Sequence, residues 1–310
     1  MRERGVSGRR LILTAVAIAL LAAVAAHLLS QRDELEYLQR LSAAVVLTTL
    51  LCQFVSQMLW NEAMRVPLRA YMALGFWELL LVRSGGFLVG TVVPVAGNVG
   101  VRMAYLKRRG LGYADFTWAT VVSNVVALFA ASVLGTIALG LVWIVAGAPP
   151  ASVVGLTAAV VTAGVAGLVS LRAVPRLAAH PRVERWSWLA ALARHRTDLR
   201  TVGWILALSA GRHACAFAAF GLLYQSLART RGGFLTGGLV YAITSPIRIV
   251  SVTPGNLGIT EWAVAAVGKL LSFDLTTGLI VALVFRGLSL AAQVLGVLLA
   301  GAWVGVRGEP

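Results

Sequence analysis

Six long stretches of the chain are almost entirely apolar, and short polar, mostly basic segments separate them. They cover residues 11–29, 41–60, 116–146, 151–171, 201–227 and 276–304. Each stretch reaches the roughly 20 residues that a helix needs to cross a bilayer. The pattern therefore predicts an all-α polytopic membrane protein.

The composition leads to the same conclusion. The chain is 59% hydrophobic and 13% charged, with a mean hydropathy of +0.84, whereas soluble chains are about a quarter charged. We expect one membrane domain over residues 1–310, with about seven or eight spans and one or two re-entrant segments. Two related halves would cover approximately residues 41–150 and 201–305. The apolar run 11–29 is longer than a signal-peptide core of about 7–15 residues, so we expect an uncleaved first helix.

The net charge of +15 would suggest a nucleic-acid partner in a soluble protein. In a membrane protein, basic residues mark the cytoplasmic loops instead. The Arg-rich N-terminus is therefore expected in the cytoplasm, and no nucleic-acid partner is expected. Segment 172–200 holds seven arginines, which predicts a basic cytoplasmic loop that binds anionic lipids or docks a protein. Arginine and alanine richness fits a GC-rich bacterial genome, so we expect the bacterial cytoplasmic membrane.

The basic cluster at residues 102–109 constrains the topology. If residues 71–93 were a simple span, this cluster would lie outside, against the positive-inside rule. We therefore predict that residues 71–93 form a re-entrant hairpin bent at residues 84–86. Irregular backbone at membrane depth is tolerated only where protein or a wet cavity covers it, so the hairpin also predicts a cavity. Residues 235–252 are expected to span, while the path of residues 259–273 and the location of the C-terminus stay open.

A short motif occurs twice, 158 residues apart: Gly97-Asn98-Val99-Gly100 and Gly255-Asn256-Leu257-Gly258. Each copy follows a proline that ends an apolar segment. A Gly/Pro-interrupted segment at equivalent places in two halves is typical of transporters whose broken helices form a shared site. Four predicted spans separate the copies, which would place both on the cytoplasmic side, and one extra crossing would make the repeat inverted.

Ionisable groups at membrane depth mark pathways or paired sites. The candidates are Glu62, Glu78, Arg83, Arg102, Arg212, His213, Arg248, Glu261 and Arg286. Arginine suits phosphate because its planar fork offers several donors, and the helix expected after Gly258 would present backbone N–H groups to an anion. The predicted headgroup site comprises both motifs (Gly97, Asn98, Gly255, Asn256 and Gly258) with Arg102, Arg248, Glu261 and Arg286.

Purely structural roles compete with these assignments. Glu261 could cap its own helix or neutralise Arg248 or Arg286. Glu78 and Arg83 could pair with each other, and the basic residues 102–109 could anchor at the interface. His213 could be a hydrogen-bonded interior residue. Glu78, Arg83, Arg212 and His213 are therefore secondary candidates.

Signals for an enzyme are missing from the sequence. It contains no Walker A, HExxH or GxSxG motif and no clustered acidic pair for a metal, so we expect neither a metal nor a cofactor. Cys52 and Cys215 form no CxxC pair. A membrane-embedded transferase acting on a polyprenyl phosphate is an alternative, but the sequence lacks the acidic metal site that such an enzyme would need.

At its motifs the chain resembles the lysylphosphatidylglycerol synthase transmembrane family, also called the flippase-like integral membrane family. The matching residues are Pro94, Gly97, Arg102 and residues 105–110 in the first half, then Pro254, Gly255, Leu257, Gly258, Glu261 and Arg286 in the second. In two places the chain departs from the family pattern. The first-half Glu is replaced at Asn98 or Gly100, and a Glu-Arg pair by Ser123-Asn124.

This resemblance implies a lipid translocase. In the family's best-known member, the membrane domain is similar to a flippase for an aminoacylated phospholipid that a separate soluble domain makes. For this chain we expect translocation of an anionic phospholipid or polyprenyl-phosphate-linked lipid. The alternative is a non-transporting membrane subunit that docks a glycosyltransferase or lipid-modifying enzyme through segment 172–200.

Overall fold

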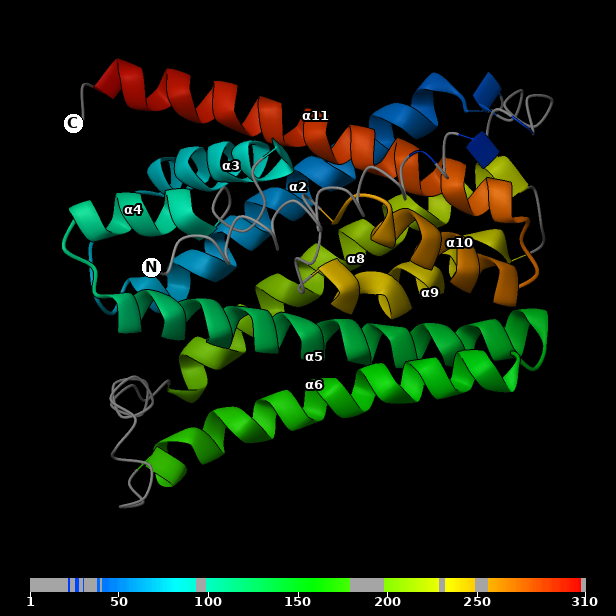
Figure 1. Ribbon diagram of the computed structural model, residues 1–310, viewed down its shortest axis with the longest axis horizontal. Helices are drawn as coiled ribbons and strands as arrows, with labels where there is room; N and C mark the ends of the chain where they lie inside the picture. The colour runs from blue at the N-terminus through cyan, green and yellow to red at the C-terminus, as the bar shows by residue number, and fades with distance from the viewer. Residues whose placement is uncertain are drawn as a thin grey trace, which may run out of the picture.

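The computed structural model describes residues 41–92, 99–178, 198–228, 232–248 and 256–307, together with a few isolated positions between 22 and 39. Throughout these ranges every regular element is a helix, so the all-α class is confirmed for them (Figure 1). In chain order the helices are α2 (Ala43–Leu68), α3 (Phe76–Val92), α4 (Val101–Arg108), α5 (Tyr113–Ala146), α6 (Ala151–Ala178), α8 (Leu199–Ala228), α9 (Gly233–Thr244), the 3-10 helix η3 (Ser245–Arg248), α10 (Ile259–Leu270) and α11 (Leu275–Arg307).

Five of the described helices are long and apolar enough to cross a membrane: α2, α5, α6, α8 and α11. They correspond to five of the six predicted stretches, and the sixth, residues 11–29, lies almost entirely outside the described residues. Helix α2 continues eight residues past its predicted end at Trp60. Glu62 in this extension pairs with both Arg65 and the C-cap Arg69 at 2.7 Å, which offsets one of the two positive charges.

Helices α3 and α4 form the first hairpin. The start of α3 lies against the end of α4, where Leu79 and Leu106 share an apolar cluster and Glu78 pairs with Arg109 at 2.6 Å. The predicted bend at residues 84–86 is wrong, because α3 runs through them without interruption. Glycine inside a helix costs only about 1 kcal/mol, and tertiary packing offsets that cost. Leu79 near the start of α3 and Leu106 near the end of α4 are neighbours, so the two helices run in opposite directions.

Helix α9, η3 and α10 form the second hairpin. Tyr224 of α8 contacts the base of both arms: a Cβ at Gly237 would lie 2.6 Å from the Cβ of Tyr224, and one at Gly268 would lie 2.8 Å from its hydroxyl. The predicted span at residues 235–252 is not among the helices long enough to cross a membrane in the described part of the chain. Helix α9 is only 12 residues long, and Pro246 in the 3-10 turn that follows cannot donate a backbone hydrogen bond.

The two hairpins enter the bundle from opposite ends of α5. The first hairpin joins the start of α5, where Leu111 and Phe116 belong to the same apolar cluster as Leu106. The second begins at Gly232, where a Cβ would lie 3.8 Å from side-chain atoms of Val145 and Ala146 at the other end of α5. A helix of 34 residues is about 50 Å long. Figure 1 shows the hairpins approaching each other from the left and right ends of the molecule.

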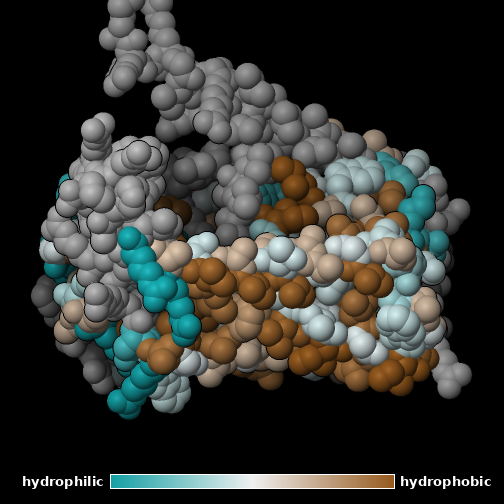
Figure 2. Space-filling view, turned by 90° about the horizontal axis from the view of Figure 1, so that it is seen from below, coloured by the Kyte–Doolittle hydropathy of each residue, from teal (hydrophilic) through white to brown (hydrophobic). Residues whose placement is uncertain are grey.

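The expectation that both motifs lie on the same side depended on four spans between them. Only three candidate spans, α5, α6 and α8, separate the hairpins in the described residues, rather than four. An odd number of crossings reverses the direction from which the second hairpin enters. The outer surface suits lipid: Figure 2 shows apolar side chains across the middle of the face and strongly hydrophilic residues at its left end. Exposed apolar residues of α5 and α6 include Ile137, Leu141, Val165 and Val169.

Candidate functional site

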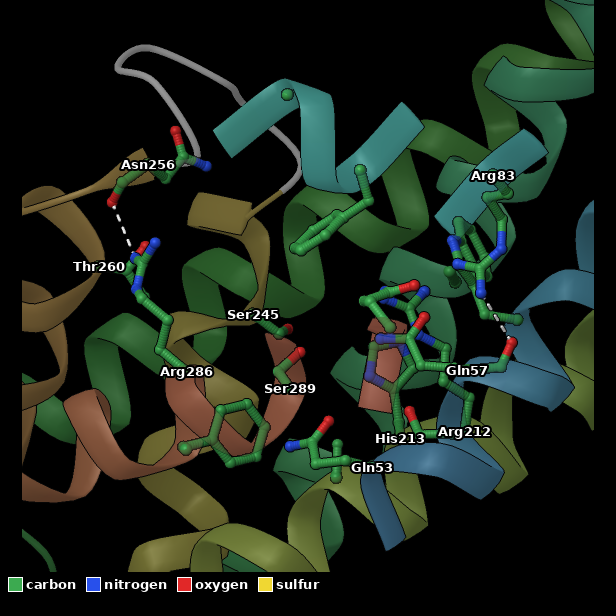
Figure 3. A pocket seen from close by; sticks show the side chains of 18 of the residues that line it. Gln53, Gln57, Arg83, Arg212, His213, Ser245, Asn256, Thr260, Arg286 and Ser289 are labelled. Atoms are coloured by element: carbon green, nitrogen blue, oxygen red, sulfur yellow. Dashed lines mark hydrogen bonds between the residues drawn. The ribbon is translucent and has the colours of Figure 1, made fainter. Parts of the chain in front are cut away.

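A cavity of about 420 Å³ lies between the two hairpins and is lined by described residues of both. Val99 and Arg102 line it from the first hairpin, and Asn256 and Glu261 line it from the second. Helices α2, α5, α8 and α11 complete the wall. The volume is within the range of about 300–1,000 Å³ typical of small-molecule sites, and the close-up in Figure 3 shows polar side chains reaching in from several helices.

Arg83, Arg102 and Arg212 form what we call the arginine cluster. Arg83 and Arg102 are 4% and 6% exposed, although both carry a guanidinium group. Arg83 Nη2 donates to the Gln57 carbonyl at 3.0 Å, while its Nε is buried without a hydrogen-bond partner among the described residues. Arg102 and Arg212 are both close enough to Arg83 to repel its charge. The cluster therefore concentrates positive charge at one part of the cavity.

Aromatic and sulfur groups hold the other two arginines. The Arg212 guanidinium lies over the Trp60 ring, 4.0 Å from its centroid. Arg102 Nη1 lies 3.1 Å from Met64 Sδ, and its guanidinium is 5.8 Å from the centre of the Phe116 ring. These contacts position the guanidinium groups without neutralising their charge.

The second hairpin brings a carboxylate that is fully engaged. Glu261 is completely buried; its Oε1 accepts from Arg286 Nε at 2.5 Å, and its Oε2 accepts from the Gly258 N–H at 2.7 Å. Gly258 has φ +80°, a conformation that favours glycine. The two structural roles expected for Glu261, helix cap and partner of Arg286, are therefore both present.

Asn256 holds the loop that precedes α10. It adopts φ 53°, which asparagine tolerates better than most residues. Its Nδ2 donates to the Ile247 carbonyl at 3.0 Å, and its own carbonyl accepts from Arg286 Nη2 at 3.2 Å. The motif therefore fixes the position of Arg286 as well as the start of α10.

Seven of the predicted site residues meet in this one cavity: Arg83, Arg102, Arg212, His213, Asn256, Glu261 and Arg286. His213 is a hydrogen-bonded interior residue, with Nδ1 2.8 Å from the Tyr241 hydroxyl. Gly258 stands beside the cavity as the cap of α10. Gly97, Asn98 and Gly255 lie outside the described residues, as does the side chain of Arg248 at the end of η3.

Glu78 does not reach the cavity, and the expected Glu78–Arg83 ion pair is wrong. Glu78 instead binds Arg109, the Tyr105 hydroxyl and the Gly75 N–H at the base of the first hairpin. Residues i and i+5 of a helix point about 140° apart, so Arg83 faces the cavity when Glu78 faces away. Of the basic residues at 102–109, Arg102 is buried, while Lys107, Arg108 and Arg109 are exposed.

The sequence interpretation missed a polar stripe on α2. Gln53, Gln57 and Trp60 line the cavity, as does Gln293 of α11. Polar residues at i, i+4 and i+7 of an apolar helix share one face, so this spacing was the available signal. Trp60 lies inside α2, and its ring contacts Arg212.

The cavity wall is strongly cationic. Four arginines and one glutamate line it within the described part of the chain, which gives an excess of three positive charges. The remaining polar groups include the amides of Gln53, Gln57 and Asn124. Guanidinium forks with amide and hydroxyl donors form a chemistry that binds an anion, phosphate above all.

Comparison with known protein families shows the family of the chain. The family described as lysylphosphatidylglycerol synthase TM region matches residues 11–296. Neither a curated protein nor a solved structure matches the chain significantly. Because the family match covers nearly the whole sequence, the chain belongs to the family of the lysylphosphatidylglycerol synthase transmembrane region.

Proposed function

We propose that this protein is a lipid translocase that moves an anionic phospholipid or polyprenyl-phosphate-linked lipid between the leaflets. The observation that carries the proposal is the cationic cavity between two hairpins that enter from opposite ends of the bundle. Transporters with inverted repeats place their substrate sites near the bilayer midplane, where discontinuous helices meet. The family assignment supports a lipid-related role in the membrane.

The charge distribution supports an orientation in the bacterial cytoplasmic membrane. The ends of α2, α4 and α6 and the start of α8 lie at one end of the bundle, because their residues share apolar clusters. The basic residues there are Arg65, Arg69, Lys107, Arg108, Arg109, Arg172, Arg176 and Arg200. By the positive-inside rule this end faces the cytoplasm. The first hairpin then re-enters from the cytoplasm and the second from outside.

In this mechanism the headgroup enters the cavity while the acyl chains stay in the lipid around the bundle. The arginine cluster binds the phosphate and replaces part of its hydration. The Glu261–Arg286 pair fixes the tip of the second hairpin, and Trp60 holds Arg212 in place. Access from each side would alternate as one hairpin moves against the rest of the bundle.

Binding and movement, rather than catalysis, are the roles proposed for these residues. A general acid–base mechanism needs a titratable group poised for proton transfer. Glu261 is committed to Arg286 and to the Gly258 N–H, and the other such group, His213, is hydrogen-bonded to the Tyr241 hydroxyl. The energy source for directional transport would lie in gradients or in a partner enzyme.

The test is a scramblase-type assay in proteoliposomes. Purified protein is reconstituted with lipids that carry a dithionite-sensitive fluorophore on an acyl chain, which leaves the headgroup unchanged. We expect anionic lipids to become accessible faster than in protein-free liposomes, and phosphatidylcholine to move much more slowly. The Arg83→Gln variant should lose at least 90% of the anionic-lipid rate, on the order of a 1.4 kcal/mol change.

The matched control is Arg108→Gln, because Arg108 is exposed and lies outside the cavity lining. It should transport at the wild-type rate. Folded protein that moves no anionic lipid, or an Arg83→Gln variant as active as wild type, would overturn the proposal.

A further inference from the structure

The charge of the cavity wall bears on how many negative charges the headgroup carries, as well as on its sign. The described lining residues carry an excess of three positive charges. A phosphodiester such as that of phosphatidylglycerol carries one negative charge. A phosphomonoester carries about −1.5 to −2 at pH 7, because its second pKa is near 6. A headgroup with two or more negative charges therefore matches the wall better than a phosphodiester does.

The positive charge is gathered in one place. Figure 3 shows Arg83 and Arg212 on one side of the cavity and Arg286 on the other. Arg83, Arg102 and Arg212 come from α3, α4 and α8 respectively, and Arg83 is repelled by both of the others. Burying like charges near one another is costly. A dianionic phosphate at this point would offset that repulsion, and its three terminal oxygens could accept from more than one guanidinium group.

The buried Nε of Arg83 is a second, independent sign of a ligand. It belongs to a side chain that is 4% exposed, and it has no hydrogen-bond partner among the described residues. Buried polar atoms are nearly always satisfied. Arg83 therefore lines the cavity with a guanidinium group whose hydrogen-bonding capacity the described residues do not satisfy.

The opposite side of the cavity is close to neutral. Arg286 is balanced by Glu261, and the nearby polar groups are the hydroxyls of Ser245, Thr260 and Ser289. Within the described lining, no second carboxylate exists that could receive an ammonium group. An aminoacylated phospholipid, whose headgroup carries such a group, is therefore a poor fit, whereas an uncharged hydroxylated moiety suits this side.

We infer that the cavity selects lipids whose headgroup is a dianionic phosphate, that is, a phosphomonoester or a diphosphate, over phosphodiester lipids. The inference rests on the proposed function and names its substrate class. The guanidinium groups of Arg83, Arg102 and Arg212 form the selective element. A soluble phosphate has the same headgroup chemistry, so the test must distinguish the two sources.

The test measures binding to the wild-type protein in a neutral detergent at pH 8, where a phosphomonoester is largely dianionic. The probes are dioleoyl phosphatidate, dioleoyl phosphatidylglycerol and dioleoyl phosphatidylcholine, which share their acyl chains, with glycerol 3-phosphate and inorganic phosphate as soluble probes. We expect phosphatidate to bind at least about tenfold more tightly than phosphatidylglycerol, equivalent to about 1.4 kcal/mol. The soluble phosphates should bind much more weakly than phosphatidate.

Each other outcome has a definite meaning. Equal affinity for phosphatidate and phosphatidylglycerol, with phosphatidylcholine weaker, overturns this inference and leaves the translocase proposal standing. If no lipid binds, both fail. If the soluble phosphates bind as tightly as phosphatidate, the claim that the ligand is a lipid is overturned.

Variants locate the selective element. In Arg83→Gln the preference for phosphatidate over phosphatidylglycerol should shrink to within about threefold, because one guanidinium contact is lost. In Arg108→Gln, which alters an exposed residue outside the cavity, the preference should match wild type. A preference that survives in Arg83→Gln places selectivity elsewhere and overturns the assignment. The wild-type ratio decides the main point even if a variant fails to fold.

Discussion

The two hairpins reach one cavity from opposite ends of the bundle and bring opposite charges to it. The first contributes Arg83 and Arg102, whereas the second contributes Glu261, which Arg286 neutralises. Glu261 completes its own contacts within the protein, while the Arg83 Nε has no hydrogen-bond partner in the described structure. The comparison shows that the carboxylate of the second hairpin is satisfied within the protein, whereas the first hairpin carries a buried guanidinium donor that no described residue satisfies.

The largest effect is expected from Glu261→Gln. This change removes the partner of Arg286 and weakens the cap at Gly258. Breaking a buried ion pair by removing one partner costs about 3–5 kcal/mol, so the free energy of unfolding should fall by that order. Unfolding by a denaturing detergent, followed by circular dichroism, measures it. A change below about 1 kcal/mol would show that this pair does not hold the second hairpin.

Arg83→Met should act in the opposite direction on stability. It replaces a buried charge by an apolar side chain of similar length, so we expect the free energy of unfolding to stay unchanged or to rise by about 1 kcal/mol. Transport of anionic lipid should nevertheless fall at least about tenfold. The same unfolding and liposome assays measure both. If Arg83→Met strongly lowers the free energy of unfolding, the charge on the first hairpin stabilises the fold as the charge on the second does, and the contrast between the hairpins is lost.

Trp60→Leu tests how the arginine cluster is positioned. It removes the ring beneath Arg212, a contact worth about 1–2 kcal/mol when desolvated. We expect phosphatidate affinity to fall about threefold to tenfold, as measured in the detergent binding assay. Trp60→Phe keeps an aromatic face and should lose less. If the two variants behave alike, the ring does not hold Arg212 for the ligand.

The smallest effect is expected from Arg69→Gln, at the end of α2. Arg69 is half exposed and pairs with Glu62 at 2.7 Å, and pairs of this kind contribute about 0–1 kcal/mol. Stability should change by less than about 1 kcal/mol and transport should not change. A loss of transport as large as that of Arg83→Met would indicate that positive charge anywhere, rather than in the cavity, drives the activity.

Most of the long helices were predictable because the signal for a span is local. The ranges of α5, α6, α8 and α11 follow from apolar runs that exceed the bilayer thickness. The hairpins were harder to predict, because a short apolar run has the same hydropathy pattern whether the chain crosses the membrane there or turns back. The bend was expected at residues 84–86 of α3, yet those residues stay helical because neighbouring helices cover them.

The site was partly predictable for a similar reason. A charge inside an apolar run is costly wherever it lies, so Arg83, Arg212, Glu261 and Arg286 could be singled out from the sequence. Their partners could not. Glu78 lies near Arg83 in the sequence but binds Arg109, because helical periodicity turns it to the opposite face.

The sequence by itself determined that the chain is an all-helical membrane protein and which ionisable residues interrupt its apolar segments. Hydropathy and charge are properties of each residue, and both are known without knowledge of the residue's neighbours in space. Only the tertiary structure decided that the hairpins enter from opposite ends, that Glu261 is neutralised by Arg286, and that Arg102 and Arg212 lie near Arg83. Those facts depend on which helix faces which, and packing between segments distant in the chain sets that geometry.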